Sequence, residues 1–157
     1  MLSDSALLGL PAPAKLNLFL HVVGRRPDGK HLLESVFTLI DLHDTIDLFR
    51  LEEPVVERTG DVIGNVEKDL CVRAARLLME TFDVRSGVRI HVEKRIPAGA
   101  GMGGGSSDAA TVLIGLNRLF GLGLSRSALM ELGERLGADV PFFIFGRTGF
   151  VLSLIHI

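Results

Sequence analysis

Residues 97–108 read Pro-Ala-Gly-Ala-Gly-Met-Gly-Gly-Gly-Ser-Ser-Asp, with five glycines among positions 99–105. Glycine inside a helix or strand loses backbone entropy and packs no side chain, so this stretch is predicted to be a loop. A glycine loop that opens a helix presents free N–H groups and the positive end of the helix dipole, which together bind anions. The helix after this loop is predicted from apolar residues at helical spacing, which end before Gly121: Ala109, Val112, Leu113, Leu116, Leu119 and Phe120.

Other glycine-rich phosphate motifs fit this loop less well. The Walker loop ends in Gly-Lys-Ser/Thr, whereas this loop ends in Gly-Ser-Ser without a lysine. Gly99, Gly101 and Gly104 satisfy the dinucleotide-binding pattern, but a second helix follows Gly121 where that motif requires a strand and an acidic residue. No His-Arg-Asp or Asp-Phe-Gly follows, which excludes a protein-kinase glycine loop. A flexible Gly/Ser linker is disfavoured because an amphipathic helix follows directly, with three candidate caps: Ser106, Ser107 and Asp108.

Length, charge and cysteine usage bound the class of protein. A chain of 157 residues suits one domain with a substantial core, and its net charge of −2 gives no reason to expect nucleic acid or an anionic membrane as partner. The single cysteine, Cys71, suits a reducing compartment, and its place on an expected helix predicts a buried thiol. The sequence shows neither a signal peptide nor an apolar run of membrane-spanning length, so we expect a cytoplasmic protein.

The first expected strand carries two polar residues of interest. Residues 15–23 alternate in polarity, which predicts a strand with Lys15 and Asn17 on the same face. A solvated strand face is the more ordinary interpretation of such a pair. The two side chains are therefore candidates for a site only if other motifs point to them.

The remaining elements are predicted to form an α+β fold, because strands and helices do not alternate regularly. Asp69 and Ser125 are expected helix caps, since short polar side chains accept hydrogen bonds from the first free N–H groups. Gly137 is expected to end the last long helix. The predicted elements are strands over residues 31–40, 45–51 and 87–96, a loop over 54–67 that can include one edge strand, and helices over 69–82 and 125–137.

Asp139 is a candidate functional carboxylate. It lies between the helix end at Gly137 and the apolar run 142–145, with Pro141 two residues later. A carboxylate in that position is partly desolvated, and perturbed carboxylates are enriched at functional sites. A plain helix cap is the structural alternative, and the two roles are compatible.

Three separated motifs resemble those of the GHMP kinases, the family of galactokinase, homoserine kinase and mevalonate kinase. Residues 97–108 are similar to the phosphate loop of the family. The stretch 13–20 together with Arg-Pro-Asp-Gly-Lys-His at 26–31, and Gly-Ala-Asp-Val-Pro-Phe-Phe at 137–143, are similar to the members that act on a cytidine-diphosphate derivative of methylerythritol. The resemblance covers about residues 11–150. It implies a GHMP kinase amino-terminal domain of the ribosomal protein S5 domain 2-like type, with a mixed sheet packed on helices.

The resemblance implies an ATP-dependent kinase of isoprenoid biosynthesis that phosphorylates the 2-hydroxyl of the methylerythritol moiety. Asp139 matches the aspartate proposed as base, and Lys15 matches the lysine that pairs with it and with the reacting hydroxyl. Asn17 and His31 match positions that contact substrate, His31 near the cytosine. Mg²⁺ would neutralise the charge that develops during phosphoryl transfer. The residues that match the ATP phosphate loop are Pro97, Ala98, Gly99, Ala100, Gly101, Met102, Gly103, Gly104, Gly105, Ser106 and Ser107.

Two positions depart from the family pattern, and two other functions compete with this one. Lys30 stands where the family has a tyrosine that stacks on cytosine, and Asp69 stands where many relatives have asparagine near the adenine.

The competing functions are another GHMP small-molecule kinase and a nucleotide-binding fragment without catalysis. A role in RNA binding, suggested by the ribosomal fold, is opposed by the acidic balance and the lack of a basic stripe.

The resemblance also predicts how the chain is divided. Residues 1–152 are expected to form the amino-terminal ATP-binding domain, and residues 153–157 to be a non-native tail. Family members continue into a carboxy-terminal domain, which is expected to be absent here. An apolar face would then be uncovered in a chain that is 47% hydrophobic, so the 157-residue chain is expected to show little kinase activity and to associate.

Overall fold

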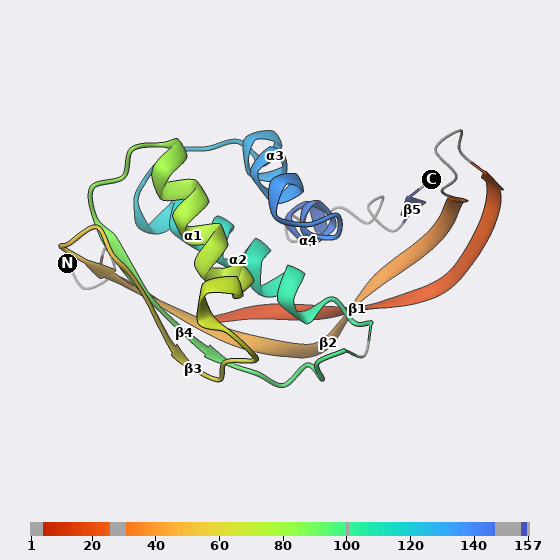
Figure 1. The fold of residues 1–157 in the computed structure, drawn as a ribbon, viewed down its shortest axis with the longest axis horizontal. Helices are drawn as coiled ribbons and strands as arrows, with labels where there is room; N and C mark the ends of the chain where they lie inside the picture. Colours follow the sequence, from red (N-terminus) through yellow and green to blue (C-terminus); the bar gives the residue numbers. More distant parts are fainter. Residues whose placement is uncertain (1–4, 26–30, 100, 147–154, 157) are drawn as a thin grey trace.

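The computed structural model describes residues 5–25, 31–99, 101–146 and 155–156, and the side chains of residues 5–17, 37–99 and 101–146. Helices cover one face of a mixed β-sheet, which confirms the predicted α+β class (Figure 1). The strands are β1 (Ala6–Arg25), β2 (His31–Leu51), β3 (Val56–Gly60), β4 (Gly87–Glu93) and β5 (Ile155–His156). The helices are the short 3-10 helix η2 (Val66–Lys68), α1 (Leu70–Thr81), α2 (Gly104–Leu119), α3 (Arg126–Leu136) and α4 (Val140–Gly146).

The sheet has the strand order β1-β2-β4-β3. Strands β1, β2 and β4 pair antiparallel, whereas β3 runs parallel to β4, with α1 as the connection between them. The short strand β5 pairs with β2 at Ser35 and Val36. Strands β1 and β2 continue together well past the helices, toward the right of Figure 1.

The first two strands are longer than the sequence pattern predicts. Strand β1 begins at Ala6 and includes Pro11 and Pro13, which lack an N–H donor. It is a terminal strand of the sheet path and pairs with β2, so these prolines sit where strands tolerate them. Strand β2 joins the predicted strands 31–40 and 45–51 into one, because pairing with β1 continues through His43 and Asp44. Pairing with a distant strand therefore keeps the mostly polar residues 41–44 extended, although their sequence predicts a break between two strands.

The helices and the core agree more closely with the sequence. Asp69 caps α1, Ser125 caps α3, and Gly137 lies at the carboxyl end of α3, as predicted. Val88, Ile90 and Val92 of β4 are fully buried beneath α1 and α2, while His91 is only partly buried. The region expected as a loop contains the edge strand β3. None of the helices described here is long and apolar enough to cross a membrane.

Candidate active site

The glycine loop forms one side of a pocket of about 270 Å³. The loop residues 97–99 and 101–105 line it together with the start of α1, where Asp69 and Leu70 contribute. Lys94, which follows β4, and Asp108 of α2 also line the pocket. The pocket therefore lies at the amino-terminal ends of two helices, α1 and α2.

Helix α2 begins without a side-chain cap. Its N-cap is Gly103, in the left-handed conformation with φ of 72°, and no side chain caps the helix. The prediction that Ser106, Ser107 or Asp108 caps this helix is wrong, because the helix starts before them, at Gly104. A left-handed glycine reverses the chain without a side chain, so the first N–H groups remain available to a ligand.

Gly103 lies where three segments of the protein meet. A Cβ atom at this position would come within 2.8 Å of Cζ of Phe143 on α4 and 3.3 Å of Cε of Lys15 on β1. By contrast, a Cβ at Gly99 or Gly101 would meet nothing within 4 Å, although both also have φ of 72°. The loop is thus open toward the pocket and closely packed at Gly103.

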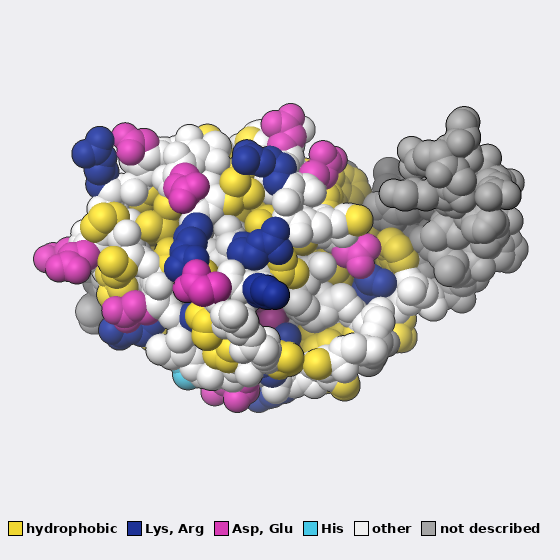
Figure 2. Space-filling model, viewed as in Figure 1, with side chains coloured by type: hydrophobic (Ala, Val, Ile, Leu, Met, Phe, Trp, Pro, Cys, Tyr) yellow, Lys and Arg dark blue, Asp and Glu magenta, His cyan; other side chains and the backbone are white. Residues whose placement is uncertain are grey.

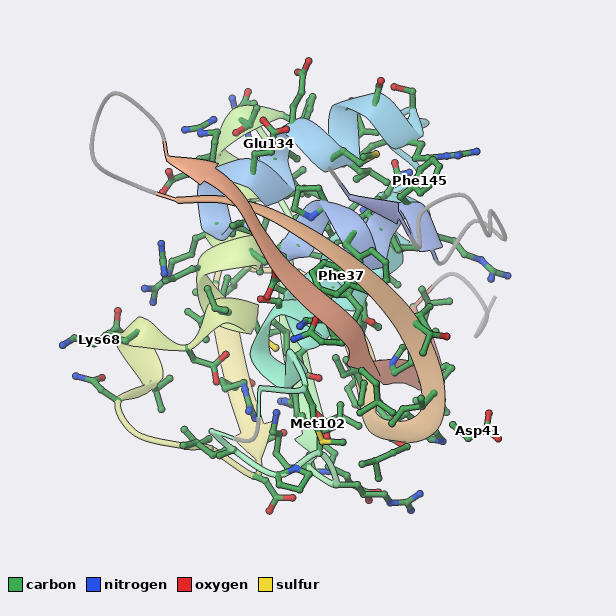
Figure 3. All side chains as sticks on the ribbon, turned by 90° about the vertical axis from the view of Figure 1, so that its right-hand side faces the viewer. Phe37, Asp41, Lys68, Met102, Glu134 and Phe145 are labelled. Atoms are coloured by element: carbon green, nitrogen blue, oxygen red, sulfur yellow. The ribbon has the colours of Figure 1, made fainter. Side chains whose placement is uncertain are left out.

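Lys15 is buried against the loop, with a relative accessibility of 5%. Its backbone N–H donates to the carbonyl of Met102 at 2.9 Å, and its Nζ lies 3.4 Å from the carbonyl of Gly101. Nζ also donates to Oδ1 of Asn17 at 3.3 Å, so the two side chains share a face as predicted. The prediction of a solvated strand face is wrong for Lys15, because Gly101 and Met102 of the loop contact this middle part of β1. Figure 3 labels Met102, whose carbonyl accepts the hydrogen bond from the Lys15 N–H, and Phe37, whose ring lies beside the Lys15 ammonium.

Asp139 is positioned by the helix that contacts this same region. It is partly buried and directly precedes α4, whose Phe142 packs edge-on against Phe37 at a centroid distance of 5.2 Å. The ammonium of Lys15 lies 4.5 Å from the Phe37 ring centroid. Within the described part of the chain, Lys15 and Asp139 form no ion pair, and Lys15 binds the loop and Asn17 instead. Their joint action therefore stays a prediction.

A buried charge cluster beside the loop was not predicted from the sequence. The Nζ of Lys94 lies 2.7 Å from Oδ2 of Asp44 and 2.8 Å from Oδ2 of Asp108. Asp44 is fully buried, and its Oδ1 accepts hydrogen bonds from the backbone N–H groups of Arg95 and Ile96. Asp44 thereby fastens the segment that leads into the glycine loop.

The cluster shifts the acidity of its members in opposite directions. Burial, and then the neighbouring Asp44, raise the pKa of Asp108 to about 8. Burial alone would raise the pKa of Asp44, but hydrogen bonds from Asp108, the Ile96 N–H and Lys94 lower it. The two carboxylates likewise raise the pKa of Lys94, although burial opposes this. Of the two carboxyl groups, Asp108 is therefore the one that favours its protonated form, and Asp44 the one that favours its ionised form.

Other predicted residues have mixed outcomes. Asp69 accepts hydrogen bonds from the N–H groups of Cys71 and Val72, and its other oxygen lies 3.4 Å from Nε of Arg58. The Cys71 thiol is buried as predicted, and burial raises its pKa well above the usual value. His31 begins β2, but its side chain lies outside the described residues.

The remaining predictions concern two residues, a metal site and the charge pattern of the surface. Ala100 of the loop and Lys30 lie outside the described residues. Among the residues that the structure describes, no group of three or more His, Cys, Asp or Glu side chains could hold a metal ion. In the described part of the face shown in Figure 2, Lys and Arg are interspersed with Asp and Glu, so this face has no continuous basic stripe.

Comparison with known proteins supports the resemblance of the three motifs. Two relatives named 4-diphosphocytidyl-2-C-methyl-D-erythritol kinase are similar along most of this chain. That of Polynucleobacter necessarius subsp. necessarius (strain STIR1) is 61% identical over 145 residues, covering 92% of this chain and 49% of the relative. That of Ralstonia pickettii (strain 12J) is 59% identical over 141 residues, covering 89% and 49%. The chain spans about half the length of the curated relatives it matches.

Solved structures give the same fold. A crystal structure of 4-(cytidine 5'-diphospho)-2C-methyl-D-erythritol kinase superposes with a TM-score of 0.75 at 43% identity, covering 87% of this chain and 48% of that one. Mevalonate kinase from L. major superposes with a TM-score of 0.63 at 16% identity, covering 92% and 47%, which shows a shared fold. The family model described as the GHMP kinases N terminal domain matches residues 69–147, which include the glycine loop and Asp139. This chain therefore belongs to the GHMP kinase family.

Proposed function

We propose that this chain carries the ATP-binding half of a kinase that phosphorylates the 2-hydroxyl of 4-diphosphocytidyl-2-C-methyl-D-erythritol. The observation that carries the proposal is the meeting of three motifs at Gly103. A Cβ there would touch both Lys15 of β1 and Phe143 of α4, one helical turn after Asp139. The phosphate loop, the lysine and the helix after the aspartate thus converge. High identity to kinases of this name supports the choice of substrate.

The residues of the loop fit the phosphates of ATP. The helix dipole and uncapped N–H groups of α2 favour anions, and Gly99 and Gly101 leave open space beside the backbone. Residues 97–107 would hold the phosphates, and the Lys94 ammonium adds positive charge beside the first residue of α2. Bound Mg²⁺ would supply charge neutralisation on the phosphate oxygens; we assign it no protein ligand.

Lys15 and Asp139 would act on the reacting hydroxyl. Asp139 would accept its proton, and the ammonium of Lys15 would stabilise negative charge on the transferred group. Asn17 is exposed and accepts a hydrogen bond from the buried Lys15, and it would contact the substrate, as would His31. The lone buried thiol of Cys71 suits a reducing compartment, so we place the reaction in the cytoplasm.

Two measurements test the proposal. Calorimetry should show MgATP binding to the 157-residue chain. For transfer, the chain would be joined to the carboxy-terminal half of the Polynucleobacter relative and assayed with the cytidine substrate, mevalonate and homoserine. Preference for the cytidine substrate is expected, whereas transfer to mevalonate or homoserine would indicate a different GHMP kinase. Binding of MgATP without transfer to any acceptor would indicate a nucleotide-binding module.

The aspartate can be tested in the same joined protein. Asp139→Asn should lower kcat by roughly 100- to 10,000-fold, because proton transfer by a positioned base contributes about that much. Affinity for MgATP should change little. Glu134→Gln, an exposed change on α3, is the matched control. An Asp139→Asn variant with undiminished kcat would remove Asp139 from the mechanism.

A further inference from the structure

The cluster of Lys94, Asp44 and Asp108 lies beside the proposed nucleotide site, so its net charge affects the binding of phosphates. Lys94 is hydrogen-bonded to two carboxylates, and both are almost completely buried. If both were ionised, the cluster would carry a net negative charge next to a loop that receives phosphates. A negative charge in a region of low dielectric would repel a polyphosphate strongly. The cluster therefore favours a bound anion more when one of its carboxyl groups holds a proton.

The geometry identifies which carboxyl group that is. Asp44 uses both oxygens: Oδ1 accepts from two backbone N–H groups, and Oδ2 accepts from Lys94. Asp108 uses only Oδ2, and its Oδ1 is buried without a hydrogen-bond partner among the described atoms. Asp108 also lines the pocket. Of the two carboxyl groups, Asp108 therefore has an oxygen without a hydrogen-bond partner and lines the pocket that a ligand would occupy.

We propose, on the basis of the nucleotide site inferred above, that Asp44 and Asp108 are positioning residues that hold the Lys94 ammonium at the start of α2, and that bound MgATP makes Asp108 keep its proton to higher pH than in the free protein. The Lys94 ammonium lies 3.4 Å from where a Cβ of Gly104 would be, so it is directly above the first residue of the helix. Asp44 fixes it from the sheet, and Asp108 fixes it from the helix. Protonated Asp108 keeps the Lys94 hydrogen bond without adding negative charge.

The pKa values of two titratable groups beside Asp108, Cys71 and Lys94, are shifted away from the neutral range. Burial raises the pKa of Cys71 well above 9.0, and the carboxylates raise the pKa of Lys94 above 10.5. The pKa of Asp108, at about 8, lies between the raised pKa values of Cys71 and Lys94 and the lowered pKa of Asp44. The groups that face Asp108 or line the same pocket are Lys94, Asp44, Cys71, Asp69, Arg58, Lys68 and, across Gly103, Lys15.

The affinity of the 157-residue chain for MgATP, measured from pH 7 to 9.5, tests the proposal. Phosphate groups lose their last proton near pH 6, so the ligand itself changes little in this range. Wild-type affinity is expected to fall by on the order of tenfold as pH rises beyond the Asp108 pKa of about 8. Asp108→Asn should remove that decline, because the amide is permanently neutral. Asp41→Asn, an exposed carboxylate on the same strand as Asp44, should keep it.

Asp44→Asn provides a readout that a purely structural role would not change. Asp44 helps to raise the pKa of Asp108, so its neutralisation should move the decline in affinity to lower pH. It should also weaken binding severalfold at every pH, because the hydrogen bonds that fasten Arg95 and Ile96 are weakened. Circular dichroism of each variant would verify folding. An Asp44→Asn profile with an unmoved midpoint would contradict the coupling.

A measurement on the unmodified chain covers the case in which a variant does not fold. Calorimetry at pH 8 in buffers of different ionisation enthalpy counts the protons taken up with MgATP, and uptake of about half a proton is expected. Binding with no proton uptake, or with identical pH profiles for wild type and Asp108→Asn, overturns the role of Asp108 and leaves the nucleotide site in place. No binding at any pH overturns both proposals.

Discussion

The two helices that open onto the pocket begin in opposite ways. Helix α1 is closed at its amino end: Asp69 accepts hydrogen bonds from two of its N–H groups, and Arg58 lies beside the same carboxylate. Helix α2 is open: its N-cap is a left-handed glycine, and no side chain caps it. Since a cap occupies the groups that an anion would bind, only α2 can offer its amino end to phosphates. The cap stabilises the start of α1, whereas the uncapped start of α2 is the end that we propose binds phosphates.

A substitution at the open end should have the largest effect. Gly103→Ala adds a Cβ that would lie 2.8 Å from the Phe143 ring, at a backbone φ of +72°. The steric cost is about 1–3 kcal/mol, so we expect a roughly 10- to 100-fold loss of affinity for MgATP in calorimetry. Gly101→Ala is the matched control, with the same φ but nothing within 4 Å of its Cβ, and should lose less. Equal losses would show that close packing at Gly103 is unimportant.

An intermediate effect is expected from neutralising the carboxyl group within α2. The pKa of Asp108 is raised from 3.8 to about 8, so between these values the folded state binds a proton that the unfolded state releases. Its contribution to stability is therefore present at low pH and is lost as pH rises toward 8. Asp108→Asn should increase the free energy of unfolding at pH 8 by about 1–3 kcal/mol and change little at pH 4. Urea unfolding at both pH values measures this, and an equal change at both would refute it.

The smallest effects are expected at the closed helix ends. Asp69→Ala removes the cap of α1 and should lower the free energy of unfolding by about 1–2 kcal/mol, because Arg58 also loses its partner. Ser125→Ala removes the cap of α3, far from the pocket, and should cost about 1 kcal/mol. Thermal unfolding compares the two. The comparison of helix ends fails if Asp69→Ala reduces MgATP affinity as strongly as Gly103→Ala does.

Local patterns in the sequence predicted the parts of this fold that local interactions determine. The caps at Asp69 and Ser125 and the inward face of β4 follow from short-range hydrogen bonding and alternation, and the structure confirms them. The predicted capping of α2 by Ser106, Ser107 or Asp108 was wrong, because Gly103 in the left-handed conformation starts the helix earlier. Polarity alone does not reveal a start of that kind.

The site required long-range information. Lys15 is buried because a loop more than eighty residues away covers it, which alternation along β1 cannot indicate. The Asp44–Lys94 pair joins residues fifty positions apart, and Asp44 fell between two predicted strands that the structure merges into β2. Asp108 was considered only as a cap. One local signal was available: Lys94 is the last charged side chain but one before the glycine loop, next to a predicted phosphate site.

The position of Asp44 has a consequence for how the loop acquires its order during folding. The pairing of β2 with β4 ends at Thr45 and Glu93; Asp44 is the adjoining residue of β2, and Lys94 directly follows β4. Pairing of β2 with β4 therefore closes the segment between Asp44 and Lys94 and carries the loss of chain entropy. The buried ion pair between these residues then requires little further loss of entropy. In kinetic terms, Asp44→Asn should accelerate unfolding and leave the folding rate nearly unchanged, as a chevron plot would measure. If the chevron plot shows this, the glycine loop becomes ordered after the sheet beneath it has paired and loosens before that sheet separates.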